Sequence, residues 1–202
     1  ALAIAHAWKP RLAILGRSPE PAHEPDWLSR LSTDAEIKQA LIARSPVGTL
    51  PRVIDAQLKQ ILAEREVATS LSQLRASGIP LTYHAVDVRD LATLRPLISQ
   101  LQRDYGPVRG IIHGAGVLAD GRIEDKTREQ FERVVETKVA GLRHLLASIL
   151  PDDLRLLGVF SSYTARYGRV GQCDYAIANE VLNKQSRQFA IEHPQTHVVS
   201  FN

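Results

Sequence analysis

The feature that most constrains the fold of this chain is the alternation of short apolar segments with stretches of helical periodicity. Such alternation indicates βαβ units and a parallel sheet. The apolar segments are rich in Val, Ile and Leu, as expected for strands covered on both faces. The expected strands are Arg11–Leu15, Pro80–Val86, Val108–His113, Leu154–Phe160 and His197–Phe201. The sequence therefore predicts an α/β fold with a doubly wound parallel sheet and helices on both faces.

A charged region, about residues 31–78, separates the first two expected strands. Thr33 or Asp34 is suited to cap a short helix that ends near Arg44. Residues 45–51 contain two prolines and a glycine, which break that helix. A second helix with a periodic apolar side follows and is expected to stop at Gly78. We interpret this region as a helical insertion packed on the sheet, not as a separate domain.

Composition excludes several classes of function. The 202 residues suffice for one α/β domain, and no segment approaches the ~18–20 apolar residues of a membrane span. The single Cys173 excludes an internal disulfide and fits a reducing, cytoplasmic compartment. A net charge of +3, without a Lys/Arg run, zinc spacing or aromatic ladder, gives no reason to expect nucleic-acid or metal binding.

In open parallel sheets, ligands bind beyond the carboxyl ends of the strands. Small, polar or charged residues follow every expected strand, and together they describe a nucleotide cleft. They are Gly16-Arg17-Ser18, Asp87-Val88, Gly114-Ala115-Gly116, Ser161-Ser162 and Asn202.

Each of these segments also has an ordinary interpretation. Arg17 lies where it can hold a ribose 2′-phosphate and so select NADPH, or it is a solvated arginine. Asp87 either accepts a hydrogen bond from an adenine amine or forms a turn. Gly114 and Gly116 let backbone approach a ligand closely, or they belong to a plain loop. His113 is expected to be structural.

Lys138 falls on the apolar stripe of a helix expected over about residues 128–149. The stripe consists of Phe131, Val135, Leu142, Leu145 and Ile149. A lysine on a core-facing stripe needs a partner or a ligand, because a buried ammonium without one is costly. The alternative is that Lys138 reaches the edge of the helix and solvent.

Ser162, Tyr175 and Asn179 complete a candidate active site. Tyr175 and Asn179 are one helical turn apart and share a face, although Tyr175 alone could be an ordinary tyrosine. A serine hydroxyl can hold a carbonyl oxygen where negative charge develops, and a tyrosine can deliver a proton. With a lysine nearby to stabilise the phenolate, this set is suited to reducing a ketone.

At these residues the chain resembles the short-chain dehydrogenase/reductase superfamily and, within it, the ketoreductase domains of type I polyketide and polyunsaturated fatty-acid synthases. The resemblance rests on Ile111-Ile-His-Gly-Ala-Gly-Val117, Ala85-Val-Asp-Val88, Phe160-Ser-Ser162 and Gly168-Arg-Val-Gly-Gln172. Tyr175-Ala-Ile-Ala-Asn179 has asparagine where other members of the superfamily carry lysine, and this exchange with Lys138 is typical of synthase ketoreductases. The helical insertion and the ending Val198-Val-Ser-Phe-Asn202 look most like those of ketoreductases from polyunsaturated fatty-acid and enediyne-type iterative synthases.

The resemblance implies a Rossmann-like fold and a role for each motif residue. Ser162 and Tyr175 are implied to be catalytic, with Lys138 and Asn179 orienting the cofactor ribose and relaying protons. NADPH is the implied cofactor, held by residues 16–18, 87–88 and 114–116 and by Lys138 and Tyr175. Leu118-Ala-Asp120 aligns with a motif of ketoreductases that yield the D (3R) alcohol, and Gln172 accompanies Asp120 in the implied substrate-side set.

The expected function is therefore NADPH-dependent reduction of a β-ketoacyl thioester on an acyl carrier protein to the β-hydroxyacyl thioester. Residues 1–202 are expected to be the catalytic ketoreductase domain, as a fragment of a larger multidomain synthase whose other domains are partners. The first βα unit, with its Gly-rich phosphate loop, is expected to be truncated. Two alternatives stay open: a non-catalytic structural half of a synthase, which usually lacks the serine and tyrosine, and a free-standing short-chain oxidoreductase, against which Asn179 argues.

Overall fold

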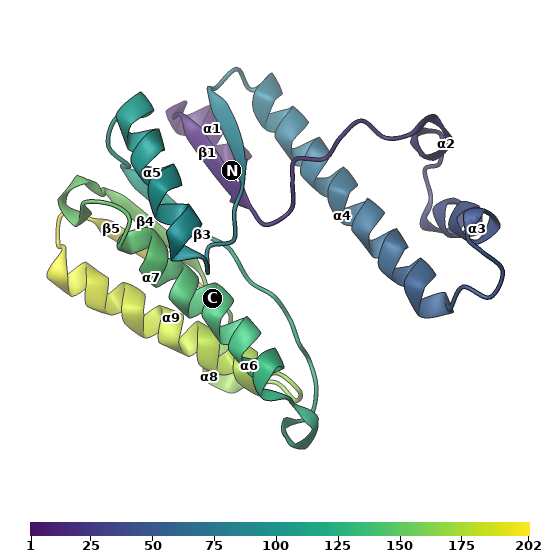
Figure 1. Cartoon of the computed structure of the whole chain (residues 1–202). Coiled ribbons are helices and arrows are strands. Elements are labelled where there is room, and N and C mark those ends of the chain that lie inside the picture. Colours follow the sequence, from purple (N-terminus) through teal and green to yellow (C-terminus); the bar gives the residue numbers. More distant parts are fainter. The chain divides into compact units, whose positions relative to one another are not determined.

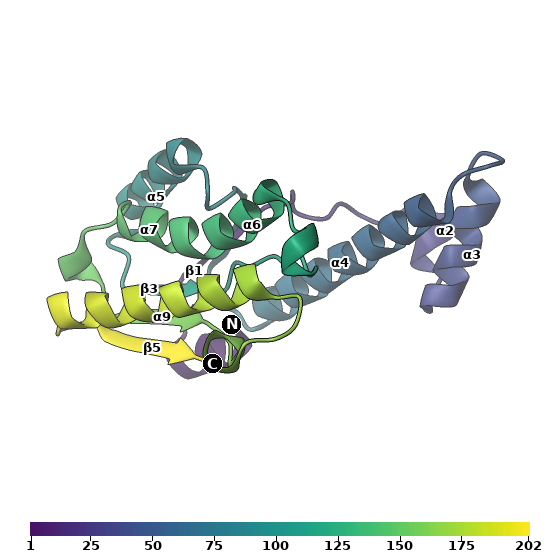
Figure 2. The same cartoon turned by 90° about the horizontal axis from the view of Figure 1, so that it is seen from below.

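The computed structural model describes residues 1–202 and divides into two compact units, residues 1–85 and 86–202 (Figures 1 and 2). The first unit contains α1 (Leu2–Trp8), β1 (Leu12–Gly16), α2 (Asp26–Ser29), α3 (Asp34–Arg44), α4 (Pro51–Ala76) and β2 (Leu81–Ala85). The second contains α5 (Leu91–Tyr105), β3 (Gly110–His113), α6 (Arg128–Val135), α7 (Gly141–Leu146), β4 (Leu156–Phe160), α8 (Thr164–Tyr167), α9 (Cys173–Glu192) and β5 (His197–Phe201).

The sheet of the first unit has two parallel strands. β1 pairs with β2 in a register that runs from Leu12 opposite Leu81 to Gly16 opposite Ala85. Ala5 of α1, Leu74 of α4 and Ile79 are buried together against apolar side chains of both strands. Apolar residues at one face of each helix thus hold α1 and the end of α4 on this small sheet.

The insertion folds as the sequence predicts but packs differently. Thr33 caps α3 in a capping box with Glu36, and α4 ends before Gly78, whose φ of +75° suits glycine. Only the C-terminal end of α4 packs on the sheet, through Leu74. The rest of α4 packs on α2 and α3 around a separate cluster of Leu28, Ile37, Leu41 and Ile54. The insertion was expected to pack on the sheet, and it does so through the end of α4 only.

The second unit is built on a three-stranded parallel sheet in the order β3-β4-β5. Its register pairs Gly110 with Leu156 and Leu156 with His197. All five predicted strands are confirmed, with bounds that differ by two residues at most, and the α/β class and parallel pairing are confirmed as well. Hydrogen bonds pair the strands in two parallel sets, β1 with β2 in the first unit and β3-β4-β5 in the second.

The helix expected over residues 128–149 is interrupted in its middle. α6 runs into a π-helical turn, Glu136–Ala140, and α7 follows and ends at Leu146. π-helical turns inside α-helices are rare and occur frequently at functional sites. This one contains Lys138.

Candidate active site

An open cavity of about 400 Å³ lies at the carboxyl ends of β3 and β4 and the start of α9. The cavity is lined by Gly114, Gly116, Val117, Leu118, Lys138, Phe160, Ser161 and Tyr175. Lys138 and Tyr175 come from different helices, and the glycines follow β3. The parallel sheet therefore brings these predicted site residues together, as strand ends on one edge should.

Lys138 is buried, with 3% of its surface exposed, and points into this cavity. Its Nζ donates a hydrogen bond of 2.8 Å to the Phe160 carbonyl and lies 5.4 Å from the centroid of the Tyr175 ring. No carboxylate forms an ion pair with it, and burial lowers the pKa of the ammonium below its ordinary value. The alternative in which Lys138 reaches solvent is excluded by this burial.

His113 fixes the backbone at Lys138. Its Nε2 lies 2.9 Å from the Lys138 carbonyl, in the π-helical turn. Burial lowers the pKa of His113 to about 4, so the ring is neutral near pH 7 and the nitrogen that faces the carbonyl carries the proton. His113 is 2% exposed, which confirms its expected structural role. His113 also holds the backbone of Lys138 in place, a role that its position in the sequence did not indicate.

Tyr175 and Asn179 occupy successive turns of α9. The Asn179 Nδ2 donates a 2.7 Å hydrogen bond to the Tyr175 carbonyl. Asn179 is fully buried, and its Oδ1 has no hydrogen-bond partner. A buried amide oxygen without a partner is unusual and requires an explanation such as a ligand or a bound water.

Ser162 lies just after β4 but does not line the cavity, where Ser161 is found instead. The Ser162 Oγ accepts hydrogen bonds from the Thr164 hydroxyl at 2.8 Å and from the Thr164 backbone N–H at 3.3 Å. Because both contacts use the oxygen as acceptor, the Ser162 hydroxyl hydrogen stays free to donate. Thr164, which is 2% exposed, was missed in the sequence.

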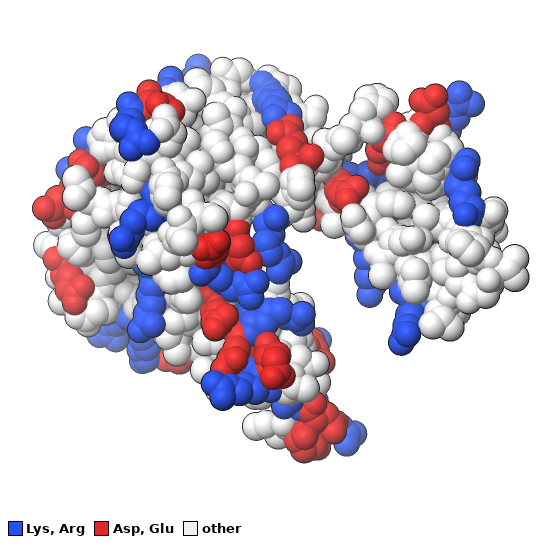
Figure 3. All heavy atoms as spheres, in the orientation of Figure 1, with Lys and Arg blue, Asp and Glu red and all other residues white.

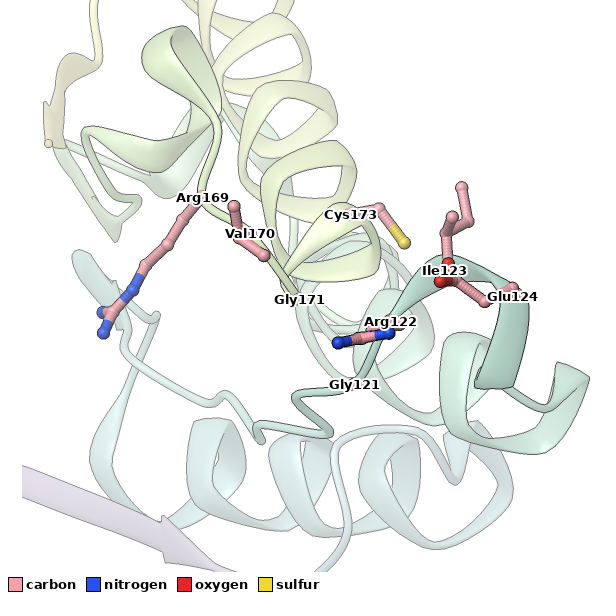
Figure 4. Close-up of a pocket in the computed structure, with 8 residues that line it drawn as sticks. All are labelled: Gly121, Arg122, Ile123, Glu124, Arg169, Val170, Gly171 and Cys173. Atoms are coloured by element: carbon pink, nitrogen blue, oxygen red, sulfur yellow. The ribbon is translucent and has the colours of Figure 1, made fainter.

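Asp120 and Gln172 meet across two loops. The Gln172 Nε2 donates to the Asp120 carboxylate at 2.9 Å, and Gln172 is 4% exposed. A second cavity of about 400 Å³ opens beside this contact, lined by residues 121–124, residues 169–171 and Cys173 (Figure 4). A buried ion pair between Lys126 and Asp174 also joins the loop after Asp120 to the first turn of α9. No sequence signal identified it, because an acidic residue in a first helical turn is commonplace.

Asp87 and Val88 follow β2 and belong to the second unit. The Asp87 carboxylate accepts hydrogen bonds from the Arg89 backbone N–H and from its guanidinium, with a closest distance of 2.7 Å. These contacts within residues 87–89 support the interpretation of Asp87 as a turn former. The Val88 carbonyl lies 3.0 Å from the Nδ1 of His144.

The segment Gly16-Arg17-Ser18 lies at the carboxyl end of β1 in the first unit. The Tyr83 hydroxyl donates to the Ser18 carbonyl at 2.8 Å and closes over Gly16, where a Cβ would collide with it. The Arg17 side chain is exposed. Tyr83 thus shapes this turn, and the absence of a side chain at Gly16 is what makes room for it.

The fold and this cavity define a class. A parallel α/β sheet with tyrosine, lysine and serine at its carboxyl edge is the arrangement of the short-chain dehydrogenase/reductases, which are oxidoreductases. An alcohol dehydrogenase from the archaeon Thermococcus sibiricus, complexed with 5-hydroxy-NADP, shares the fold. Its TM-score is 0.59 at 20% identity, and the match covers 64% of this chain and 56% of that one.

Within this class, the chain belongs to the ketoreductase family: residues 3–201 match the family profile described as "KR domain". It is 37% identical over 180 residues to a polyunsaturated fatty acid synthase polypeptide of Thraustochytrium, and this match covers 85% of the chain and 6% of that protein. It is 38% identical over 113 residues to polyketide synthase PksL of Bacillus subtilis, covering 56% of the chain and 2% of that protein. The chain therefore spans a small part of the curated relatives it matches.

Solved ketoreductases are similar in structure as well. The ketoreductase PlmKR1 of phoslactomycin biosynthesis in Streptomyces has a TM-score of 0.60 and 35% identity, over 66% of this chain and 30% of that one. A ketoreductase domain from the bacillaene assembly line has a TM-score of 0.61 and 34% identity, over 68% of this chain and 34% of that one. Ketoreduction is the activity that this family membership implies. No helix of the structure combines the length and apolar character needed to cross a membrane.

Proposed function

We propose that this chain catalyses NADPH-dependent reduction of a β-ketoacyl thioester, carried on an acyl carrier protein, to the β-hydroxyacyl thioester. The observation that carries the proposal is the buried Lys138 ammonium, which lacks a carboxylate partner and lies 5.4 Å from the Tyr175 ring in one cavity. Such a charge is costly to bury, so its retention at this position is best explained by the chemistry of Tyr175.

Residues at this carboxyl edge of the sheet, in the cavity and beside it, divide the reaction between them. The Ser162 hydroxyl donates to the ketone oxygen and stabilises negative charge as it develops there. The Tyr175 hydroxyl gives its proton to that oxygen, and Lys138 stabilises the phenolate that remains. Asn179 holds the Tyr175 turn of α9 through the carbonyl of that residue. A reduced nicotinamide, when bound, supplies the hydride.

Two observations support a cofactor of this kind in the second unit. The buried Asn179 Oδ1 offers an unused acceptor to a ribose hydroxyl. Gly116 keeps the space beside Lys138 open, since a Cβ there would lie 3.2 Å from the lysine Cε. We assign the nicotinamide side of NADPH to Gly114, Ala115, Gly116, Lys138 and Tyr175.

In the first unit we assign the ribose 2′-phosphate to Arg17, whose exposed guanidinium follows a turn shaped by Gly16, Ser18 and Tyr83. Val88 and Asp87 remain proposed for the adenine, with Asp87 limited by its contacts to Arg89. Replacing Arg17 by alanine is then expected to raise the KM for NADPH roughly 10- to 150-fold and to leave the KM for NADH unchanged, because a phosphate contact is worth roughly 1.5–3 kcal/mol.

The remaining assignments concern substrate, partners and compartment. We infer the D (3R) alcohol from Asp120, which Gln172 holds in place. Charge gives little support for a particular carrier surface, since Figure 3 shows acidic and basic side chains interspersed over the visible face of α6 and the loop before it. The relatives are large synthases, which supports further synthase domains as partners. The lone Cys173 supports a reducing, cytoplasmic setting.

The test is NADPH oxidation by the full-length protein with a β-ketoacyl thioester surrogate, compared between the parent and Tyr175→Phe. Turnover in the variant is expected to fall by roughly 10²–10⁴-fold, the range of general acid catalysis. Tyr167→Phe is the matched control, because Tyr167 is 83% exposed and has no assigned role. A parent that binds NADPH but does not reduce the thioester would refute the enzyme and favour a structural half of a synthase.

A further inference from the structure

We propose that the buried ion pair Lys126–Asp174 is a positioning device that fixes Tyr175 relative to the loop of Asp120, and so sets both the rate and the stereochemistry of reduction. The proposal rests on the proposed function and adds two residues to which no role has been assigned. Neither residue is assigned a contact with the reacting atoms. They act through the backbone of the segments they connect.

The pair connects two segments that approach one another in several places. The Gly121 N–H donates to the Gly171 carbonyl at 3.0 Å, and Gln172 donates to Asp120 at 2.9 Å. Lys126 adds the strongest contact, with its Nζ 2.8 Å from the Asp174 Oδ2. Both segments also line the cavity of Figure 4. The link between loop and helix thus consists of one backbone hydrogen bond, one hydrogen bond from an amide to a carboxylate, and one ion pair.

The ends of the pair reach the backbone beside each functional residue. The Lys126 Nζ also donates to the carbonyl of Ala119, the neighbour of Asp120, at 2.6 Å. The other oxygen of Asp174, Oδ1, accepts the backbone N–H of Tyr175 at 2.9 Å. A single chain of hydrogen bonds therefore runs from the Ala119 carbonyl through two charged side chains to the Tyr175 amide.

Burial makes this link rigid. The side chains of Lys126 and Asp174 are 3% and 1% exposed, so water does not compete for either charge. A buried pair is no more stabilising than an apolar pair of the same volume, because desolvation offsets the attraction. What the pair provides is a fixed geometry. Each charge must stay beside its partner, so the loop after Asp120 and the first turn of α9 keep their positions relative to one another. Catalytic groups depend on this, since a displacement of about 1 Å can cost roughly 100-fold in rate.

The exposed pair Glu180–Lys184 on the same helix provides a matched comparison. Its atoms are 3.2 Å apart, and its side chains are 41% and 70% exposed. Surface pairs of this kind contribute little to structure. Neutralising Glu180–Lys184 is therefore expected to leave catalysis unchanged, whereas neutralising Lys126–Asp174 is expected to impair it.

The experiment is a double-mutant cycle in the full-length protein with Lys126→Gln, Asp174→Asn and both together. The kcat with a β-ketoacyl thioester surrogate and the ratio of the two hydroxyacyl enantiomers are measured for each, with Lys184→Gln and Glu180→Gln as controls. Each single change is expected to lower kcat about 100-fold and to shift the enantiomer ratio about tenfold. The double variant is expected to lose about 100-fold as well, because both changes break the same link.

The enantiomer ratio separates positioning from stability, since it does not depend on how much of the protein is folded. The double variant leaves no buried charge without a partner and keeps the test available if a single variant unfolds. The positioning role alone would be overturned if the Lys126 and Asp174 variants kept the parent's enantiomer ratio and its kcat per folded molecule. This conclusion requires that the parent is active and that its Tyr175→Phe variant is not. A parent with no reductase activity would overturn the proposed function and this role together.

Discussion

Replacement of Lys138 by methionine is expected to separate activity from stability in this protein. Methionine matches the length of the lysine stem and removes the buried ammonium. Reduction should fall, because the phenolate of Tyr175 loses the cation that lies 5.4 Å from its ring. Folding should not suffer, because the lost group has only a carbonyl as its hydrogen-bond partner.

The distance sets the size of the effect. At an effective dielectric constant of about 20, two unit charges 5.4 Å apart interact with about 3 kcal/mol. At about 1.4 kcal/mol for each factor of ten, kcat should fall roughly 100-fold. The Lys138→Arg variant keeps the charge and should retain more of the activity than Lys138→Met.

The sign of the stability effect follows from the lowered pKa of Lys138. Between that lowered pKa and the ordinary value of 10.5, the unfolded chain binds more protons than the folded chain, so the parent gains stability as pH rises. The variant should lack this gain and should be at least as stable as the parent at pH 7.

The assay is NADPH oxidation with the thioester surrogate, together with urea unfolding at pH 7 and pH 9.5. Lys184→Met is the control, since Lys184 is exposed on α9 and pairs only at the surface. A Lys138→Met variant with kcat within threefold of the parent would refute the assignment of the lysine to Tyr175. A loss of several kcal/mol in stability would show instead that the ammonium is a structural group.

The contacts around the site and within the insertion support three more predictions. Gly116→Ala should lower kcat about tenfold without unfolding the protein, because its Cβ would press on the Lys138 Cε at 3.2 Å. Gly110→Ala should leave kcat unchanged, because its Cβ would meet only ordinary contacts. Steady-state kinetics and thermal melting of both variants check this prediction. The parent should lose roughly 3 kcal/mol of stability as pH falls from 6.5 towards 4, because the unfolded chain protonates His113 there while the folded chain does not. Urea unfolding of His113→Gln should show a flatter pH dependence, whereas His6→Gln should behave as the parent. Arg65→Met should destabilise the helical insertion by about 2 kcal/mol, since Arg65 binds the Glu24 carboxylate and the carbonyls of Leu28 and Leu31, and proteolysis within residues 24–65 should detect the change.

The sequence predicted the elements of this fold well because each depends on local pattern. Thr33 or Asp34 was expected to cap α3, and Thr33 does so with Glu36. Gly78 was expected to stop α4. Both signals act within a few residues. The π-helical turn at Glu136–Ala140 was not predicted, because the apolar spacing around Lys138 is compatible with a continuous α-helix.

The packing of the insertion also lay beyond local pattern. The sequence shows an apolar stripe along α4, but such a stripe can pack against a sheet or against other helices equally well. Only the fold assigns Leu74 to the sheet and Ile54 to the cluster with α2 and α3.

The candidate residues of the site came from the sequence, because Tyr175, Asn179, Ser162 and Lys138 are recognisable by type and spacing. Their supporting contacts came from the tertiary structure alone. His113 reaches the Lys138 carbonyl across 25 positions of the chain, and Lys126 reaches Asp174 across 48. Helix caps and apolar stripes depend on residues that are close in sequence, so the sequence alone indicates them. The burial of a charged side chain and the identity of its partner depend on segments that meet only when the sheet and its helices have formed.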